Sequence, residues 1–275
     1  MKAESMKSII FPKISVITPA YNASTYLSDL LLSVANQNYP NFEHILINDG
    51  SDDDGKTESI LKDTKGIIWW SHSNIGQYAT INKGIDVATG DYIIVISADD
   101  YIASPCVFSN IMKQCIDRNA DIVYGHHKIV DSNGVEAKHL LKPIRPVQPI
   151  LKHLLKYKGY VSHIDMFVSR QHVIDNDLWW NPKYRYSGDW EWVARTFSCA
   201  KNTLFVNQYI SCYRRHPGQI SVEKGNAELR AQEVEIISKA IGGNPTITNM
   251  LILADSIKAS IYRRTKRCLS KFNTN

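Results

Sequence analysis

The fold is decided by the stretch Ile93-Ile94-Val95-Ile96-Ser97-Ala98-Asp99-Asp100. Its four β-prone apolar residues lead directly into two adjacent carboxylates, which is the pattern of a buried strand that carries acidic groups to one edge of a sheet. In open α/β sheets, ligands bind beyond the carboxyl ends of the strands. Two carboxylates at that edge suit a hard divalent cation that also binds a diphosphate. The alternative is that Asp99 and Asp100 only begin the following turn or helix.

The size and composition of the chain are those of an ordinary globular protein. Its 275 residues fit one large domain, or a domain with an appendage, and 44% of them are hydrophobic and 21% charged. No apolar run has the length of a bilayer span, and the first residues lack the core of a signal peptide. The five cysteines are scattered and include no CxxC pair, which predicts reduced thiols in the cytoplasm and neither a disulfide frame nor a zinc site. The adjacent His126 and His127 follow a strand, but without acids nearby they should make a poor metal site.

The net charge of +5 is a modest excess, and much of it lies near the C-terminus. The basic residues there are Lys258, Arg263, Arg264, Lys266, Arg267 and Lys271. Such a tail suits an acidic membrane surface, so we expect a cytoplasmic protein at the inner face of a membrane and no nucleic-acid partner. The alternative is an ordinary packing helix with a solvated basic end.

Strands and helices alternate through the first half of the chain. Strands are predicted over residues 13–18, 42–48, 67–70, 93–96 and 120–124. One helix is predicted to begin at residue 25, and a second helix, after the second strand, is predicted to end at about residue 62. Two more helices are predicted over residues 78–88 and 107–115. Pro19 should close the first strand because it cannot donate to a ladder. This alternation predicts βαβ units and a mainly parallel sheet.

The rhythm changes after about Gly125. Prolines 143, 146 and 149 predict a loop, helical periodicity returns from Trp190, and residues 204–212 read as a late strand. Residues 226–270 predict two helices separated near Gly242-Gly243-Asn244-Pro245.

Short sequence blocks stand in a fixed order between about residues 13 and 221. They are Val16-Ile-Thr-Pro-Ala-Tyr-Asn22; Asn48-Asp-Gly-Ser51; Asn74-Ile-Gly76 with Ala79, Asn82 and Gly84; Ser97-Ala-Asp-Asp100; Gly188-Asp-Trp-Glu191; and a closing Tyr213-Arg-Arg-His216. This set resembles the inverting glycosyltransferases of family 2. The resemblance implies an α/β protein of GT-A fold, with a Rossmann-like, mainly parallel sheet flanked by helices and a C-terminal helical appendage.

The resemblance also implies a division of the chain. Residues 1–221 would form the GT-A domain, with a nucleotide-binding half over about 13–125 and an acceptor half over about 126–221. Residues 222–275 would form the C-terminal helical segment with the basic tail.

The family pattern implies a set of donor-binding residues. They are Pro19, Tyr21, Asn22, Asp49, Asn74, Gly76, Asp99 and Arg214. Tyr21 would lie against the nucleotide base, Asp49 would accept a hydrogen bond from a pyrimidine N–H, and Gly76 would let the backbone approach the ligand. The residue types alone also fit purely structural roles, since Asp49 suits a turn before glycine and Asn74 a loop that opens a helix.

The Ser97-Ala-Asp-Asp100 block corresponds to the metal motif of the family, in which an Asp usually stands at the position of Ser97. The last two acids remain, so the resemblance implies Asp100 as the direct ligand of Mn²⁺ or Mg²⁺ and Asp99 as a contact to the ribose or to a metal-bound water. His216 and Arg214 would meet the metal and the phosphates from a flap. His216 alternatively is a solvated loop histidine.

Asp189 resembles the catalytic base of the family. It precedes a helical pattern, so it also suits the N-cap, and both roles are compatible because a helix N-terminus favours the ionised carboxylate. Gly188 should leave the approach to it open. The resemblance further places His163, Asp165 and Glu191 toward the acceptor, with a buried core histidine and an exposed first-turn acid as the alternatives for His163 and Glu191.

The implied activity is transfer of a sugar from a nucleoside-diphosphate sugar, expected to be UDP-linked, to a hydroxyl of a glycan or lipid-linked acceptor. The transfer would invert configuration in one displacement and serve cell-surface polysaccharide or glycoconjugate synthesis. Two other functions stay open. A nucleotide-sugar-binding module without turnover would explain Ser97, and a sugar nucleotidyltransferase would share the acidic strand end. A nucleotidyltransferase should carry an early Gly-rich basic loop, which this chain lacks.

Overall fold

The structure, a computed structural model, describes residues 11–115, 118–136, 148–157, 159–219 and 227–254. The strands are β1 (Ile14–Ala20), β2 (Phe42–Asp49), β3 (Ile68–His72), β4 (Tyr92–Val95), β5 (Tyr101–Ile102), β6 (Ile122–Val130), β7 (Met166–Ser169) and β8 (Thr203–Arg214). The helices are α1 (Leu27–Ala35), α2 (Lys56–Asp63), α3 (Gln77–Val87), α4 (Val107–Cys115), α5 (Gln148–Leu154), α6 (Arg170–Asp175), α7 (Gly188–Cys199) and α8 (Ala227–Ala240), with a short 3-10 helix, η1 (His163–Asp165). Residues 245–254 are also helical.

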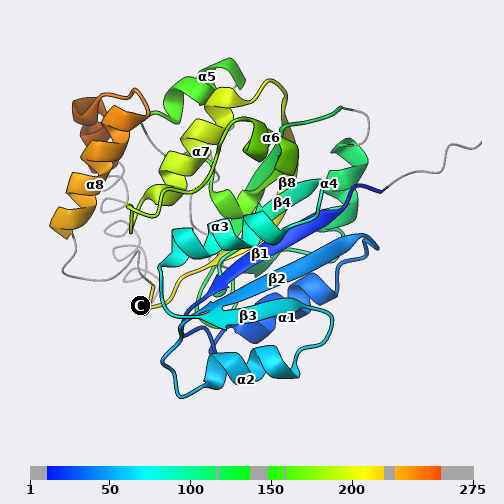
Figure 1. The fold of residues 1–275 in the computed structure, drawn as a ribbon. Helices are drawn as coiled ribbons and strands as arrows, with labels where there is room; N and C mark the ends of the chain where they lie inside the picture. The colour runs from blue at the N-terminus through cyan, green and yellow to red at the C-terminus, as the bar shows by residue number, and fades with distance from the viewer. Residues whose placement is uncertain (1–10, 116–117, 137–147, 158, 220–226, 255–275) are drawn as a thin grey trace, which may run out of the picture.

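All the strands of the described residues join one sheet in the order β3-β2-β1-β4-β7-β6-β8-β5 (Figure 1). The four strands β3, β2, β1 and β4 run parallel. β7 is antiparallel to both β4 and β6, whereas β8 runs parallel to β6 and antiparallel to β5. The predicted α/β architecture with a mainly parallel sheet is therefore confirmed.

The sheet is covered on both faces because its strands carry apolar side chains on both. On one face, Val16, Leu46 and Ile94 pack under α1, α2 and α4. On the other face, Ile17 and Ile47 pack under α3, and the same core continues beneath α5 and α7 (Figure 1). The carboxyl ends of β1, β2 and β4 therefore meet at one edge, which is where their loops can build a site.

β1 is longer than the sequence predicted. It runs through Pro19 to Ala20, in register with β2 throughout. The carbonyl of Ile17 accepts a hydrogen bond from the N–H of Ile96, so the backbone groups of Ile17, and of Pro19 two residues later, face β4. The ladder with β4 ends at Ile17. Pro19 therefore costs the sheet no hydrogen bond, because the donor that it lacks would face a side without a partner strand.

The second half holds elements that the sequence did not reveal. The short strand β7 inserts antiparallel between the two halves of the sheet, and α5 covers residue 149, where a loop was predicted. Prolines 143 and 146 and the basic residues after 254 lie outside the described residues. In the described part of the chain, none of the helices combines the length and hydrophobicity that a bilayer crossing needs.

Candidate active site

The loop after β1 is hydrogen-bonded to Ser51 and Asp52 in the loop after β2. The Asn22 side chain donates to Asp52 Oδ1 at 2.6 Å and accepts from the Asp52 N–H at 2.9 Å. The hydroxyl of Tyr21 donates to the same Oδ1 at 3.2 Å, while the Tyr21 residue stays 50% exposed. The sequence pointed to Tyr21 and Asn22 but not to Asp52, whose role depends on this pairing between loops. The exposed ring of Tyr21 is thus held at the carboxyl edge of the sheet.

Asp49, at the end of β2, is buried and fastens the next loop. Its Oδ1 accepts the N–H of Ile75 at 2.8 Å. Gly50 has a φ of +68°, and a Cβ there would lie 2.5 Å from the backbone nitrogen of Asn74. The Asn74 side chain accepts the N–H of Gly76 at 3.2 Å just before α3 begins. The structure therefore brings the expected base-binding and backbone-approach residues to the same edge as Tyr21.

The acid pair divides into one buried and one accessible carboxylate. Asp100 is 1% exposed, and its Oδ1 accepts the backbone N–H of Arg214 at 2.8 Å. Burial, followed by the neighbouring charge of Asp99, raises the pKa of Asp100 well above its ordinary value. The Asp99 side chain is 28% exposed, and its Oδ2 lies 3.0 Å from His216 Nε2 and accepts from the Gln219 amide at 3.2 Å.

His216 is therefore not a solvated loop histidine. Its side chain is only 14% exposed and pairs with Asp99. His216 thus lies beside the acid pair, where the resemblance placed it. Gln219, which the sequence did not single out, completes the contact from the same loop.

Arg214 is committed to the protein interior, and the geometry gives no support to the expected phosphate contact. It is 2% exposed, and its guanidinium donates to Asp29 Oδ2 at 2.6 Å and to the carbonyl of Ser132 at 3.0 Å. The guanidinium carbon lies 4.5 Å from the ring centre of Tyr26 and 5.3 Å from that of Tyr101. An arginine held on all sides in this way fixes the loop that carries His216.

The donor set fits a hard cation that is shared with a ligand. Among the described residues, no group of three or more His, Cys, Asp or Glu side chains is arranged to hold a metal. Mg²⁺ and Mn²⁺ accept such incomplete sets, because they retain water and take ligands from substrate phosphates. Burial, and after it the adjacent Asp99, raises the pKa of Asp100, and a cation at this place would favour the ionised carboxylates. Asp99, whose carboxylate is more exposed than that of the buried Asp100, would contribute to such a shared site, and His216 lies beside it.

Asp189 is the second residue of α7, and Ser187 occupies the N-cap. The prediction of an N-cap role for Asp189 is therefore wrong, although its first-turn position still favours the ionised form. Its side chain is 41% exposed, and Oδ2 lies 3.8 Å from His163 Nδ1. Its backbone N–H donates to the hydroxyl of Tyr78, on the first turn of α3, at 3.3 Å.

Gly188 is required by packing. A Cβ at Gly188 would lie 2.5 Å from the ring of Tyr78, so only glycine fits against that ring. Burial, together with the charge of Asp189, raises the pKa of Tyr78 far above its ordinary value and keeps the phenol neutral. Tyr78 thus joins the loop that ends at Gly76 to the start of α7, a connection that the sequence did not show.

His163 is buried, and neither ring nitrogen has a hydrogen-bond partner among the residues that the structure describes. It stands in η1 with its ring edge against Trp180, at a centroid distance of 5.4 Å. At the other end of η1, Asp165 lies close enough to Asp100 to raise its pKa. The short helix η1 therefore links the acid pair to Asp189.

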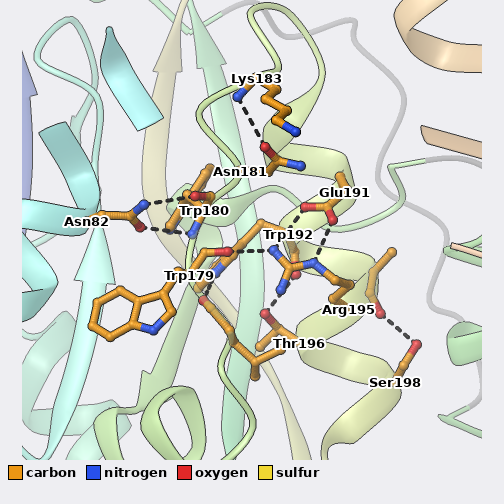
Figure 2. Close-up of polar contacts among 12 residues, drawn as sticks. Asn82, Trp179, Trp180, Asn181, Lys183, Glu191, Trp192, Arg195, Thr196 and Ser198 are labelled. Atoms are coloured by element: carbon orange, nitrogen blue, oxygen red, sulfur yellow. Dashed lines mark hydrogen bonds and ion pairs between the residues drawn. The ribbon is translucent and has the colours of Figure 1, made fainter. Parts of the chain in front are cut away.

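Asp165 and Glu191 are bound by protein groups instead of facing an acceptor. Asp165 accepts from Ser211 Oγ at 2.5 Å and lies 2.5 Å from His127 Nδ1. Burial alone would lower the pKa of His127, but the hydrogen bond and charge of Asp165 raise it. The expectation that His127 has no acid nearby is therefore wrong. Both oxygens of Glu191 accept from Arg195, at 2.6 and 3.0 Å (Figure 2).

The turn at Trp179-Trp180 is clamped from both halves of the chain (Figure 2). The Asn82 side chain in α3 donates to the carbonyl of Trp180 and accepts its N–H, both at 2.8 Å. Arg195 donates to the carbonyl of Trp179 at 2.6 Å. The Trp180 ring stacks between Tyr78 and Trp192, at centroid distances of 5.3 and 4.5 Å. These aromatics therefore form the wall behind His163 and Asp189.

Known proteins match this chain over much of its length. The sequence model described as glycosyl transferase family 2 matches residues 15–178, which include the acid pair and end before Asp189. The glycosyltransferase GlyG of Streptococcus pneumoniae serotype 4 is 25% identical over 240 residues, covering 83% of this chain and 79% of GlyG. The chain spans 27% and 79% of the lengths of the first two curated relatives that it matches.

Two solved structures share the fold. S. aureus TarS 1–349 in complex with UDP has a TM-score of 0.67 at 18% identity, covering 83% of this chain and 65% of that chain. The mannosyltransferase PcManGT from Pyrobaculum calidifontis, in complex with GDP-Man and Mn²⁺, has a TM-score of 0.57 at 14% identity, covering 88% and 69%. At these identities the likeness is one of fold.

Proposed function

This chain belongs to glycosyl transferase family 2, and from that premise we propose that it transfers a sugar from a nucleoside-diphosphate sugar to an acceptor hydroxyl with inversion. One observation carries the proposal. The half-exposed carboxylate of Asp189 is joined through Tyr78 to the ligand loop at Gly76, and through His163 and η1 to the acid pair. A base, an acid pair and a nucleotide edge are thus parts of one site.

The reaction that this arrangement supports is a single displacement. Asp189 takes the proton of the acceptor hydroxyl as its oxygen attacks the anomeric carbon. The bond from that carbon to the diphosphate breaks on the opposite face, through an oxocarbenium-like transition state, so the configuration inverts. A bound Mn²⁺ or Mg²⁺ would neutralise the charge on the departing diphosphate. Buried His163, with its ring edge against Trp180, forms the apolar side of the site next to the base.

We propose UDP as the nucleotide of the donor. Asp49, held rigidly at the end of β2, would accept the pyrimidine N–H, and Tyr21 would cover the base. The UDP complex of the similar TarS structure supports this choice, and the Mn²⁺ complex of the mannosyltransferase supports the metal. Asp99 would contact the ion or the ribose.

For the acceptor we propose a hydroxyl of a glycan or a lipid-linked sugar, in polysaccharide or glycoconjugate synthesis. The helical residues 245–254 expose Met250 and Leu253, at 65% and 61%. Together with the basic tail of the sequence, they favour contact with an anionic membrane surface that carries such an acceptor.

Thermal unfolding with a panel of nucleotide sugars tests the donor. UDP and at least one UDP-sugar should raise the melting temperature in the presence of Mn²⁺ and much less in its absence. In Asp99→Asn, the Mn²⁺-dependent part of that rise should disappear. Equal protection by all nucleotides, or none, would contradict the proposed donor site.

Product analysis then separates the three functions. With an active donor and acceptor pair, NMR of the product should show the anomeric configuration inverted relative to the donor. A protein that binds the donor but forms no product with any acceptor would instead be a binding module. Formation of a nucleotide sugar from a sugar phosphate and a nucleoside triphosphate would indicate a nucleotidyltransferase.

A further inference from the structure

One carboxylate of α8 binds three consecutive backbone N–H groups of the segment that leads into α7. Glu233 accepts from Arg185 at 2.5 Å, from Tyr186 at 2.8 Å and from Ser187 at 2.6 Å. These are the last three residues before α7, whose second residue is Asp189. The contact therefore lies two residues from the carboxylate that we assign as the base.

This contact supplies what the local sequence lacks. Ser187 is the N-cap of α7, yet its side chain makes no capping hydrogen bond. Hydrogen bonds from N–H groups to a carboxylate are roughly twice as strong as those to neutral acceptors. Consecutive N–H groups that converge on one anion also fix the backbone angles of the loop. The start of α7 is therefore fixed by a residue far along the chain.

α8 also holds the same loop through its side chains. The guanidinium carbon of Arg230, in α8, lies 5.0 Å from the ring centre of Tyr186. α8 itself is anchored, because Ile237 is fully buried and Ser238 Oγ lies 2.9 Å from Thr248 Oγ1. In Figure 1, α8 lies on the same side of the molecule as α7.

The opposite side of the loop is fixed by α3. Gly188 packs on the ring of Tyr78, and the N–H of Asp189 donates to the Tyr78 hydroxyl. Asp189 thus stands between an anchor in the nucleotide-binding half and one in the C-terminal segment. Loss of either would leave the carboxylate present but less well aimed.

We propose that Glu233 is a positioning residue for Asp189, which makes α8 a working part of the active site. The inference rests on the proposed role of Asp189 as the base. Glu233 does not touch the substrate in this proposal. It acts by holding residues 185–187, so that the base faces the acceptor hydroxyl.

The experiment compares Glu233→Ala, Glu233→Gln and the control Glu235→Ala in the full chain. Glu235 lies on the same helix, but its carboxylate pairs with Lys239 Nζ, one turn along α8, at 2.7 Å. In Glu233→Ala, kcat should fall at least tenfold, while donor KM and the Kd of UDP with Mn²⁺ stay within twofold. Glu233→Gln, which keeps the shape and one acceptor oxygen, should recover part of kcat. The control should behave as wild type.

Hydrogen exchange of the amides of residues 185–187 provides a readout that does not depend on turnover. Exchange should accelerate in Glu233→Ala and stay unchanged in Glu235→Ala. Unchanged exchange, or a kcat within twofold of wild type, would overturn the inference. An equal loss of kcat and of UDP affinity would overturn it too, because that pattern indicates general unfolding. A wild type that transfers no sugar counts against the proposed function. The exchange result would then still show whether Glu233 holds residues 185–187.

Discussion

At the scale of single residues, the chemistry depends on what each polar group is already bound to. Asp49, Asp165, Glu191 and Arg214 are held by protein partners, whereas the carboxylate of Asp189 is half exposed beside His163. The sequence blocks do not distinguish the internally bound side chains from the exposed one, because a block records only residue type and order. Which group is satisfied internally depends on partners such as His127 and Arg195, and only the fold supplies those.

Asp189→Asn should separate catalysis from structure. The substitution removes the proton acceptor but keeps the backbone N–H that meets Tyr78 and the fit of Gly188. Since general-base contributions are typically about 10²–10⁴-fold, kcat should fall by that factor while UDP affinity and melting temperature stay unchanged. Sugar transfer, UDP calorimetry and thermal unfolding of one preparation provide the check. Wild-type transfer by the Asn variant would sink the assignment of the base.

His163 should serve the acceptor rather than the fold. A buried polar group without a partner costs about 1–3 kcal/mol, so both ring nitrogens are ready to bind a group that enters. His163→Leu should keep or raise the melting temperature, yet lower kcat/KM for the acceptor about tenfold, the loss expected for one hydrogen bond of about 1.4 kcal/mol.

The control for His163 is His163→Asn, which keeps a donor near the position of Nδ1. It should retain more acceptor activity than the Leu variant, and donor KM should not change in either. A large loss of stability in His163→Leu would show instead that the ring is a packing residue.

At the scale of elements, two family positions in α3 are required for different physical reasons. Asn82 clamps the Trp180 turn, and Gly84 lets the helix approach the sheet. A Cβ at Gly84 would lie 2.5 Å from Ile17 Cγ2, a branch atom that cannot move away easily.

Gly84→Ala should therefore destabilise the protein, despite the better helix propensity of alanine. Overpacking costs about 1–3 kcal/mol, and alanine gains roughly 1 kcal/mol over glycine within a helix. The free energy of unfolding should fall by roughly 1 kcal/mol, measured by urea titration. Asp86→Ala, on the exposed face of the same helix, is the matched control. A Gly84→Ala variant as stable as wild type would refute the close approach.

The β1–β2 pair should make stability depend on pH through His44. Burial lowers the pKa of His44 to about 3, and its Nε2 lies 3.1 Å from Thr18 Oγ1. The unfolded chain takes up a proton near pH 6.5, whereas the folded protein resists protonation until about pH 3. This contribution to stability is thus complete above pH 6.5 and declines as the pH falls through that window.

The measurement is urea unfolding of wild type and His44→Gln at pH 7.5 and 5.5. The slope from one such histidine is at most about 1.4 kcal/mol per pH unit, so wild type should lose about 1 kcal/mol more than the variant. Only the difference between the two proteins counts, because other groups titrate in both. Equal losses would show that His44 becomes protonated in the folded state.

At the scale of the whole molecule, the sequence predicted the nucleotide half better than the acceptor half. Alternating strands and helices such as β1, α1 and β2 have strong local periodicity, and their boundaries moved by only a few residues. The short strands β5 and β7 carry little pattern of their own, because tertiary pairing creates them. The sequence did not indicate the roles of Gln219 and Glu233 for the same reason, since their partners lie far away in the chain.

The contacts of α3 limit where two homologous chains can be joined to make a hybrid protein. A cut near residue 125 looks natural from the alternation of strands and helices, yet Tyr78 and Asn82 reach past it to Gly188 and Trp180. A hybrid joined there would combine the α3 of one parent with the aromatic turn and base of the other. Residues 77–87 should therefore come from the same parent as the C-terminal half when acceptor preferences are exchanged between homologues. The segments to exchange together are therefore separated in the sequence, although they are in contact in the fold.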